Sequence, residues 1–218
     1  MAVLDEEHPQ IGGERPHTPP VDYLVEDGVA VVALNRPERL NAVNAALVEE
    51  LCTSLDRAAA ANVGALVLCG RGRAFSAGHD LKEDSNDKNP GMTRQRLWRL
   101  QDVTRKIQQL PVPAIAAVQG FALGAGCEFA LSCDLVLAHP DAIFGFPEVE
   151  VGLSVTGGIS YLLPHLVGPA KAKELVLFGT RVDATEALRL GLVNAVTKDA
   201  MAQARTWALE LAGRPRVA

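Results

Sequence analysis

The sequence has few aromatic residues and no excess of positive charge. Phe, Trp and Tyr make up 5% of its 218 residues, and 26 acidic residues outnumber 21 Lys and Arg. The resulting formal net charge is −5 at pH 7. Proteins that bind nucleic acid usually present clustered Lys and Arg, so this balance argues against nucleic acid as a partner.

Cysteine motifs typical of metal or redox sites are also missing. Cys52, Cys69, Cys127 and Cys133 form no Cys-x-x-Cys pair, and no histidine stands at a spacing suited to zinc. Unpaired cysteines of this kind are typical of reducing compartments. We therefore expect four buried free thiols, a cytoplasmic location and no metal site.

The beginning of the chain lacks the basic segment and apolar core of a signal peptide. Residues 1–20 instead hold four prolines among Asp, Glu, His and Gly. Such a composition cannot bury enough apolar surface to offset the entropy of ordering, so a disordered tail is predicted there.

The rest of the sequence alternates short β-rich runs with amphipathic helices, which indicates an α/β fold with mostly parallel strands. An Asp-Gly pair at 27–28 predicts a hairpin, and Asn44 is expected to cap a helix carrying Leu47, Leu51 and Leu55. Polar residues at 84–91 predict a mobile loop. The other expected elements are strands at 65–69, 113–120, 135–138 and 193–196, and helices at 93–109, 125–133, 159–167, 171–178, 184–190 and 199–212.

Residues 113–148 hold the pattern that most needs a chemical explanation. An apolar run leads into the turn Gly124-Ala125-Gly126, then an apolar helix, then a second apolar run. Glu128 lies in that helix among apolar neighbours, and Glu148 follows the second run. A buried carboxylate without an evident partner is costly, which makes both glutamates candidates for chemistry.

Three other interpretations of this stretch were compared. A membrane span over 112–138 would place Glu128 and Asp134 in lipid, at about 2.5–3.5 kcal/mol each. A dinucleotide-binding fingerprint would need a third glycine where Phe129 stands. A strand and helix packed for stability alone would explain the alanines but not Glu128.

Ser76 offers an alternative nucleophile. It is one glycine short of a Gly-x-Ser-x-Gly elbow, because Ala74 occupies the first position. With Asp134 or Asp141 and His165 downstream, the chain order suits an α/β-hydrolase triad. Serine beside small residues is also common in turns, so the purely structural interpretation competes with this one.

Several blocks together resemble the crotonase family, the enoyl-CoA hydratases and isomerases. The resemblance runs from about residue 21 to 197 and implies a spiral of ββα turns as the core domain. It also implies that 198–218 begins a helical trimerisation region, which is truncated here. The blocks are 74–82, 120–134 and 144–158, with supporting pieces at 35–38, 40–42 and 184–194.

The resemblance implies an oxyanion hole and a glutamate pair. Family members hold the thioester carbonyl with two backbone N–H groups, which match those of His79 and Ala125, while the His79 imidazole is expected to be incidental. One such donor typically contributes about 2.7–4 kcal/mol to lowering the barrier. Glu148 matches the residue that protonates Cα, and Glu128 the one that positions and activates water.

The resemblance also implies where coenzyme A lies. Coenzyme A is part of the substrate, so no separate cofactor is expected. Basic side chains nearby could attract its phosphates, namely Arg36, Arg71, Arg73 and Lys82. The expected substrate contacts are Asn41, Ala42, Ala77, Gly78, Asp80, Leu81, Lys82 and Gly124.

The expected function is hydration of trans-2-enoyl-CoA to 3-hydroxyacyl-CoA. Simple isomerases of the family commonly keep only the carboxylate at the position of Glu148, and dienoyl-CoA isomerases have aspartate where Thr156 stands. The alternatives are a Δ3,Δ2-enoyl-CoA isomerase and a non-catalytic acyl-CoA-binding or scaffold protein. The expected partners are an acyl-CoA thioester and further copies in a homotrimer or dimer of trimers, without membrane. Glu150 should share the face of Glu148 if a strand continues there.

Overall fold

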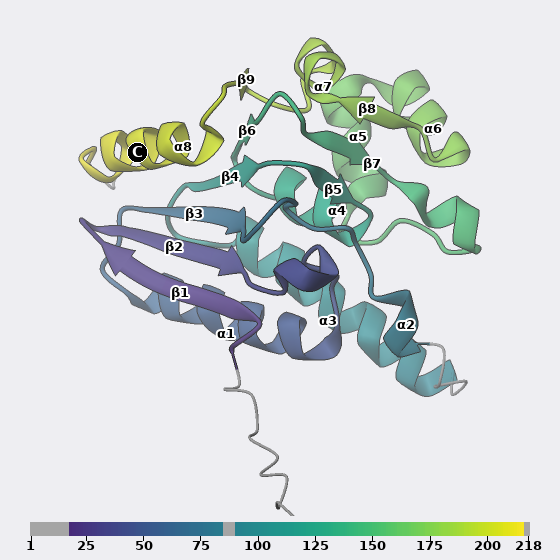
Figure 1. Cartoon of the computed structure of the whole chain (residues 1–218), viewed down its shortest axis with the longest axis horizontal. Helices are drawn as coiled ribbons and strands as arrows, with labels where there is room; N and C mark the ends of the chain where they lie inside the picture. Colours follow the sequence, from purple (N-terminus) through teal and green to yellow (C-terminus); the bar gives the residue numbers. More distant parts are fainter. Residues whose placement is uncertain (1–17, 85–89, 216–218) are drawn as a thin grey trace, which may run out of the picture.

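The computed structural model describes residues 18–84 and 90–215, which contain two β-sheets and the helices around them (Figure 1). The large sheet has the strand order β1-β2-β3-β4-β6-β9, and the small sheet has the order β5-β7-β8. Only the β1–β2 and β7–β8 pairs of these sheets are antiparallel. The large sheet comprises Val21–Glu26, Val29–Leu34, Ala65–Gly70, Ala114–Val118, Leu135–Ala138 and Ala195–Val196, and the small sheet comprises Phe121–Leu123, Ile143–Gly145 and Arg181–Asp183.

The chain moves between the two sheets in a repeating order. Strand β4 pairs with β6 in the large sheet, while β5, which follows β4, pairs with β7, which follows β6. Two successive turns of the chain, β4–β5 before α4 and β6–β7 before η2, thus each add one strand to each sheet. This arrangement confirms the predicted α/β spiral of ββα units.

Helices and short helical turns complete the fold. The helices α1, α3, α5, α7 and α8 all lie close to their predicted positions. Polar residues predicted to form a loop at 84–91 are partly helical, since α2 ends at Asp84 and α3 begins at Pro90; residues 85–89 lie outside the described part. The helical elements are η1 Pro37–Arg39, α1 Ala45–Ala60, α2 Leu81–Asp84, α3 Pro90–Gln108, α4 Ala125–Leu131, η2 Pro147–Val151, α5 Ile159–Val167, α6 Pro169–Phe178, α7 Ala184–Leu190 and α8 Ala200–Ala212.

The hairpin and the first helix form as their sequences predict. Asp27 and Gly28 both have positive φ, 52° and 76°, which is the backbone that a two-residue type I′ turn needs. Asn44 caps α1 by accepting a hydrogen bond from the Leu47 amide at 2.9 Å. The predicted apolar side of α1, which includes Leu51, is buried against the sheet.

Both faces of the large sheet are covered, which explains its nearly continuous apolar strands. In β3, Leu66 and Leu68 face the core shared with α1, whereas Ala65 and Val67 face α8. Helix α8 presents small residues to the sheet, namely Ala200, Ala204 and Ala208.

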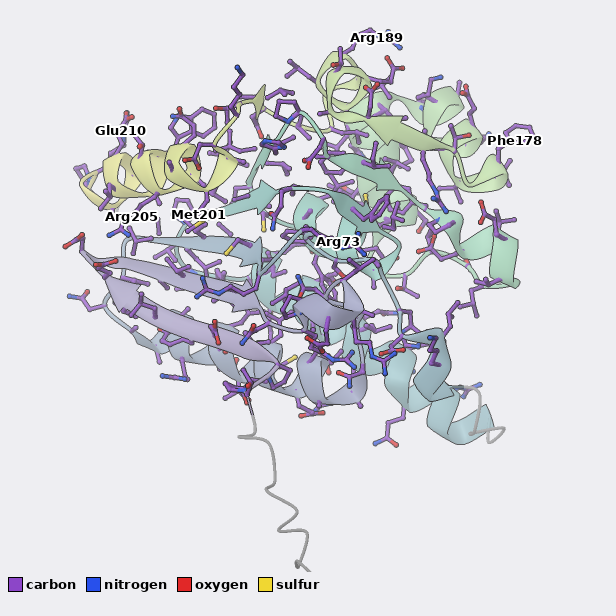
Figure 2. All side chains as sticks on the ribbon, viewed as in Figure 1. Arg73, Phe178, Arg189, Met201, Arg205 and Glu210 are labelled. Carbon is purple, nitrogen blue, oxygen red and sulfur yellow. The ribbon has the colours of Figure 1, made fainter. Side chains whose placement is uncertain are left out.

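An ion pair joins α8 to the turn between β1 and β2. Arg205 of α8 lies 2.7 Å from Glu26 and 3.3 Å from Asp27, at the hairpin turn (Figure 2). The helix that the resemblance assigns to the start of a trimerisation region therefore packs against the sheet of its own chain.

The four cysteines are buried and free, as the absence of paired motifs predicts. Burial raises the pKa of the Cys69 thiol to about 11, so this thiol stays protonated at neutral pH.

Asn41 joins three segments that are distant in sequence. Its side chain is fully buried, accepts a hydrogen bond from the Arg36 amide at 2.8 Å, and donates to the carbonyls of Arg71 at 2.9 Å and Ala74 at 2.8 Å. Its φ of 53° lies in the left-handed region, which asparagine tolerates better than most residues. Asn41 thus fixes the loop that leads toward the expected substrate-binding residues.

The Asn41→Ala variant should lose about 2–4 kcal/mol of unfolding free energy, because three backbone groups lose a buried partner and alanine disfavours positive φ. Urea denaturation measures this loss. The matched control is Asn44→Ala, which removes the α1 helix cap and should cost about 1 kcal/mol. A loss at Asn41 no larger than that of the control would contradict the joining role.

Candidate active site

Three backbone segments meet where the resemblance places the substrate. Residues 41–43 run beside residues 76–80, since the Val43 amide donates to Gly78 at 2.8 Å and the Asp80 amide donates to Val43 at 2.9 Å. The second segment also contacts β5, whose Leu123 amide donates to the Ser76 carbonyl at 3.0 Å. The fold therefore brings Ala42, the 77–80 segment and the turn after β5 together.

Gly78 and Gly124 allow the two predicted oxyanion turns to approach closely. A Cβ atom on Gly78 would lie 2.7 Å from the Leu123 carbonyl oxygen and 3.6 Å from the Gly124 Cα. Gly124 has φ 51° and ψ −125°, a combination that essentially only glycine adopts. The amides of His79 and Ala125 directly follow these two glycines.

The Ala125 amide lies at the first position of α4. The first amides of a helix have no acceptor within the helix and lie at the positive end of its dipole. No side chain caps this end, because the preceding residue is Gly124. The described geometry is suited to a partial negative charge at this position.

Glu128 is buried inside the protein with 1% of its surface exposed. Its Oε1 accepts a hydrogen bond from the Thr156 amide at 2.6 Å, and its Oε2 accepts one from the Thr156 hydroxyl at 2.7 Å. Burial raises the pKa of Glu128, and these two hydrogen bonds act against that rise. Thr156 is a polar partner that the sequence did not reveal.

Glu148 occupies a different environment on the neighbouring turn η2. Its Oε1 would lie 3.2 Å from a Cβ placed on Gly124, so the carboxyl group borders the turn that precedes α4. Its Oε2 is buried without a hydrogen-bond partner among the described residues. Burial raises the pKa of Glu148 to about 7, its own amide opposes the rise, and the charge of Glu128 adds to it.

The site thus combines two carboxyl groups, which interact electrostatically, and backbone amides that lie beside them. One carboxyl group is held by two donors, and the other has a pKa near neutrality. Such a pair can divide the roles of base and acid in one proton-transfer reaction.

Comparisons with known proteins agree with this arrangement. A family model described as Enoyl-CoA hydratase/isomerase matches residues 25–218. The chain belongs to this family. A probable enoyl-CoA hydratase of Rhizobium meliloti (strain 1021) is 44% identical over 174 residues, which cover 77% of this chain and 65% of that protein. Another, of Rhodobacter capsulatus, is 38% identical and covers 79% of this chain and 66% of its own length.

Solved structures show that the likeness extends to the fold. The enoyl-CoA hydratase from Thermoplasma volcanium GSS1 superposes with a TM-score of 0.86 at 30% identity, covering 91% of this chain and 79% of that one. The Bacillus anthracis enoyl-CoA hydratase gives 0.86 at 33% identity, covering 90% and 78%. The chain spans about two thirds of the length of the curated relatives named above. The predicted crotonase membership and fold are confirmed.

The hydrolase alternative for Ser76 is wrong for this member of the enoyl-CoA hydratase/isomerase family. The Ser76 hydroxyl is buried, donates to the Asn41 carbonyl at 2.8 Å and accepts from the Gly78 amide at 3.2 Å. The proposed partner His165 is exposed and bonds instead to the Tyr161 carbonyl at 2.7 Å. Ser76 therefore holds the loops at Asn41 and Gly78 together.

The expected acidic partners of Ser76 also have local structural roles. Asp134 accepts a hydrogen bond from the Ala114 amide at 2.7 Å, which joins the end of α4 to the start of β4. Asp141 accepts from the Gly120 amide at 3.1 Å and contacts His139 across the β6–β7 turn. Neither aspartate belongs to a triad with Ser76.

Glu150 does not share the face of Glu148, because the chain forms the 3-10 turn η2 rather than a strand. Glu150 is exposed, and its Oε1 would lie 3.4 Å from a Cβ on Gly179, at the end of α6. Its carboxyl group therefore points away from the pair formed by Glu128 and Glu148.

Several expected substrate contacts have other roles within the protein. The main chain of Asn41 is used internally, since its amide donates to Arg36 at 2.9 Å and its carbonyl accepts from Ser76. Arg36 pairs with Asp80 at 3.0 Å and donates to the Ala42 carbonyl at 2.5 Å. These internal contacts fix the loops to one another.

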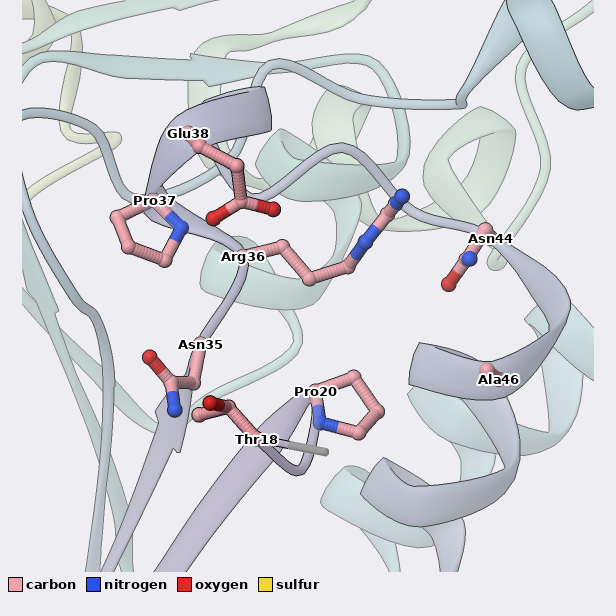
Figure 3. A pocket seen from close by; sticks show the side chains of 8 residues that line it. All are labelled: Thr18, Pro20, Asn35, Arg36, Pro37, Glu38, Asn44 and Ala46. Atoms are coloured by element: carbon pink, nitrogen blue, oxygen red, sulfur yellow. The ribbon is translucent and has the colours of Figure 1, made fainter. Parts of the chain in front are cut away.

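A cavity of about 450 Å³ opens beside these loops (Figure 3). Figure 3 shows the Arg36 side chain extending across it toward Asn44, at the start of α1. Two further expected substrate contacts, Leu81 and Lys82 of α2, do not line this cavity and are exposed. The cavity is lined by Thr18, Pro20, Asn35, Arg36, Pro37, Glu38, Asn44 and Ala46.

Within 18–84 and 90–215, no group of three or more His, Cys, Asp and Glu side chains is arranged to hold a metal ion. No described helix is long and apolar enough to cross a membrane.

The raised pKa of Glu148 predicts how stability depends on pH. Between its ordinary pKa of 4.5 and about 7, the folded protein binds this proton more tightly than the unfolded chain does. The unfolding free energy should therefore fall as pH rises through this interval. Partial solvent exposure screens the effect, so we expect a fall of about 1–2 kcal/mol.

Urea titrations from pH 5 to pH 8 measure this slope. Glu148→Gln should reduce it, leaving a part that belongs to Glu128. Glu150→Gln, at an exposed carboxylate two residues away, is the matched control and should keep the parent slope. Equal slopes in the parent and Glu148→Gln would remove the basis for a neutral carboxyl group at this position.

Proposed function

We propose that the protein adds water to trans-2-enoyl-CoA thioesters and forms 3-hydroxyacyl-CoA. The observation that supports this proposal is the pair of carboxyl groups, Glu128 and Glu148, held in unlike environments beside Gly124. Hydration needs one group that takes a proton from water and another that gives a proton to carbon. Two of the relatives named above are probable enoyl-CoA hydratases, which favours the same reaction.

The proposed reaction begins with the thioester carbonyl at the amides of His79 and Ala125. Ionised Glu128 takes a proton from a bound water, and the water oxygen attacks Cβ. The electrons of the carbon–carbon double bond move toward the thioester oxygen, where the two amides stabilise the resulting enolate. Protonated Glu148 then gives its proton to Cα.

This sequence balances as the addition of one water molecule. The C–O bond at Cβ and the C–H bond at Cα form, while one O–H bond of water and the acid O–H bond of Glu148 break. Glu128 ends protonated and Glu148 ends ionised, so a proton passes from Glu128 to Glu148 or through solvent before the next turnover. Glu148 suits the acid role because its pKa is raised to about 7.

A Δ3,Δ2-enoyl-CoA isomerase is the second candidate, and one observation favours it. Glu128 is 1% exposed, and both of its oxygens already accept hydrogen bonds from Thr156. If water cannot reach this carboxylate, Glu148 alone could move a proton between two carbons. Each carboxylate oxygen has a further lone pair, however, and a water can bind there as well.

Coenzyme A is proposed to arrive as part of the substrate, with no separate cofactor. Its phosphates are placed toward Arg73 and Lys82, which are exposed on neighbouring segments (Figure 2 labels Arg73). Arg71 is a weaker candidate because it pairs with Asp22 at 2.9 Å. Trimer assembly, with residues 21–197 as core and 198–218 as the start of the assembling region, is part of the same proposal.

Glu148→Gln should lower the rate of hydration by at least about a hundredfold, because a general acid typically contributes that much or more. Binding of a 3-hydroxyacyl-CoA product, measured by calorimetry, should change little. The hydration rate is followed by loss of the conjugated thioester absorbance. Turnover equal to that of the parent in a folded variant would exclude Glu148 as the acid.

Glu128→Gln separates the two candidate reactions. It should reduce hydration of 2-enoyl-CoA far more than isomerisation of 3-enoyl-CoA, since only hydration needs a base that activates water. Both rates are measured on the parent and the variant, and Glu150→Gln serves as the control. Equal losses in the two reactions would argue against hydratase, and a parent that isomerises without hydrating would identify the isomerase.

A further inference from the structure

Thr156 stands between η2 and α5 and contacts both oxygens of one catalytic carboxylate. Its amide reaches Glu128 Oε1 at 2.6 Å and its hydroxyl reaches Oε2 at 2.7 Å. The carbonyl of the same residue accepts the Ile159 amide at 2.9 Å, which ties the residue to the first turn of α5. Thr156 therefore binds both oxygens of the Glu128 carboxyl group.

Gly157 permits this close approach. A Cβ at this position would lie 2.9 Å from Glu128 Oε2 and 2.9 Å from the Thr104 side chain of α3. Its φ of 56° is also one that glycine adopts readily. The chain therefore passes too near the carboxylate for any larger residue to stand there without movement.

The two donors of Thr156 favour the ionised form of Glu128. A carboxylate accepts at both oxygens, whereas a neutral carboxyl group must use one oxygen as a donor. The amide of Thr156 can only donate, so protonation would force its hydroxyl to turn around and accept. Removing the hydroxyl should therefore make protonation of Glu128 easier.

We propose that Thr156 is a positioning residue that keeps Glu128 ionised and oriented, and thereby makes Glu128 the base and Glu148 the acid. This inference rests on the proposed function, because it assigns roles within the same carboxyl pair. Glu148 lacks an equivalent clamp, since its Oε2 has no partner among the described residues. A single threonine thus gives the two glutamate side chains different hydrogen-bonding environments.

The titratable groups around Glu128 are compatible with this assignment. Glu148 faces it from η2 and interacts with it electrostatically. Cys127, the preceding residue of α4, interacts electrostatically with both carboxyl groups. Burial raises the pKa of its thiol, so the thiol stays neutral. Thr104 contributes a methyl group from α3 and bonds its hydroxyl to the Gln101 carbonyl at 3.0 Å.

Three variants test the proposal through the pH dependence of kcat/KM for hydration. Thr156→Val keeps the shape and the amide but removes the hydroxyl. The acidic limb should move upward by about one pH unit, and activity at neutral pH should fall by about ten- to a hundredfold. Thr156→Ser restores the hydroxyl and should return the limb to its parent position. Thr104→Val removes a neighbouring buried hydroxyl that does not contact Glu128, and its acidic limb should match the parent.

An infrared titration tests the same clamp without turnover. The carboxylate band that disappears in Glu128→Gln identifies this side chain. Its midpoint should lie at higher pH in Thr156→Val than in the parent, Thr156→Ser or Thr104→Val. This readout separates the two proposals: a shifted midpoint in a protein that hydrates no enoyl-CoA would support the clamp while rejecting the hydratase.

Two results would overturn the positioning role. One is an unchanged Glu128 midpoint in folded Thr156→Val, even if hydration is confirmed. The other is an equal loss of activity in Thr156→Val and Thr156→Ser with no movement of the acidic limb, which would indicate only a packing role.

Discussion

The burial of the Glu128 carboxyl group is the constraint on which the arrangement of the site depends. A carboxylate with 1% exposure is costly unless donors replace its lost water. Both donors come from Thr156, which follows η2, so the turn carrying Glu148 and the helix carrying Glu128 are joined by this contact. The two glutamates therefore differ in the donors that they receive: Glu128 has two, whereas Glu148 Oε2 has none among the described residues.

Much of the fold was predictable because the large sheet is buried on both faces. Strands β3 and β4 are apolar runs bounded by Gly or Pro, and α1 shows clear helical periodicity with a defined cap at Asn44. The strands of the small sheet were not predicted as separate elements. Each of β5, β7 and β8 has three residues, which is too short for a two-residue alternation to stand out.

The sequence singled out both glutamates, through their apolar neighbours and the family resemblance, but it did not reveal how each is held. Thr156 is a polar residue in a loop, and its contact with Glu128 depends on the path of a chain that contains two glycines with positive φ. The condition under which Glu150 would share the face of Glu148, a continuing strand, is not met, because η2 turns there as a 3-10 helix. Ser76 looked reactive only because its partner, the Asn41 carbonyl, cannot be read from spacing.

The position of α8 in the chain affects synthesis. The strands it covers all precede it, and its Ala200, Ala204 and Ala208 close one face of the large sheet. As domains fold from their N-terminal side on the ribosome, a nearly complete sheet would have that apolar face open until α8 emerges. A nascent chain that stalls before residue 200 would expose this apolar surface to chaperones and to other nascent chains. Slow codons placed within the α8 coding region would lengthen that period of exposure.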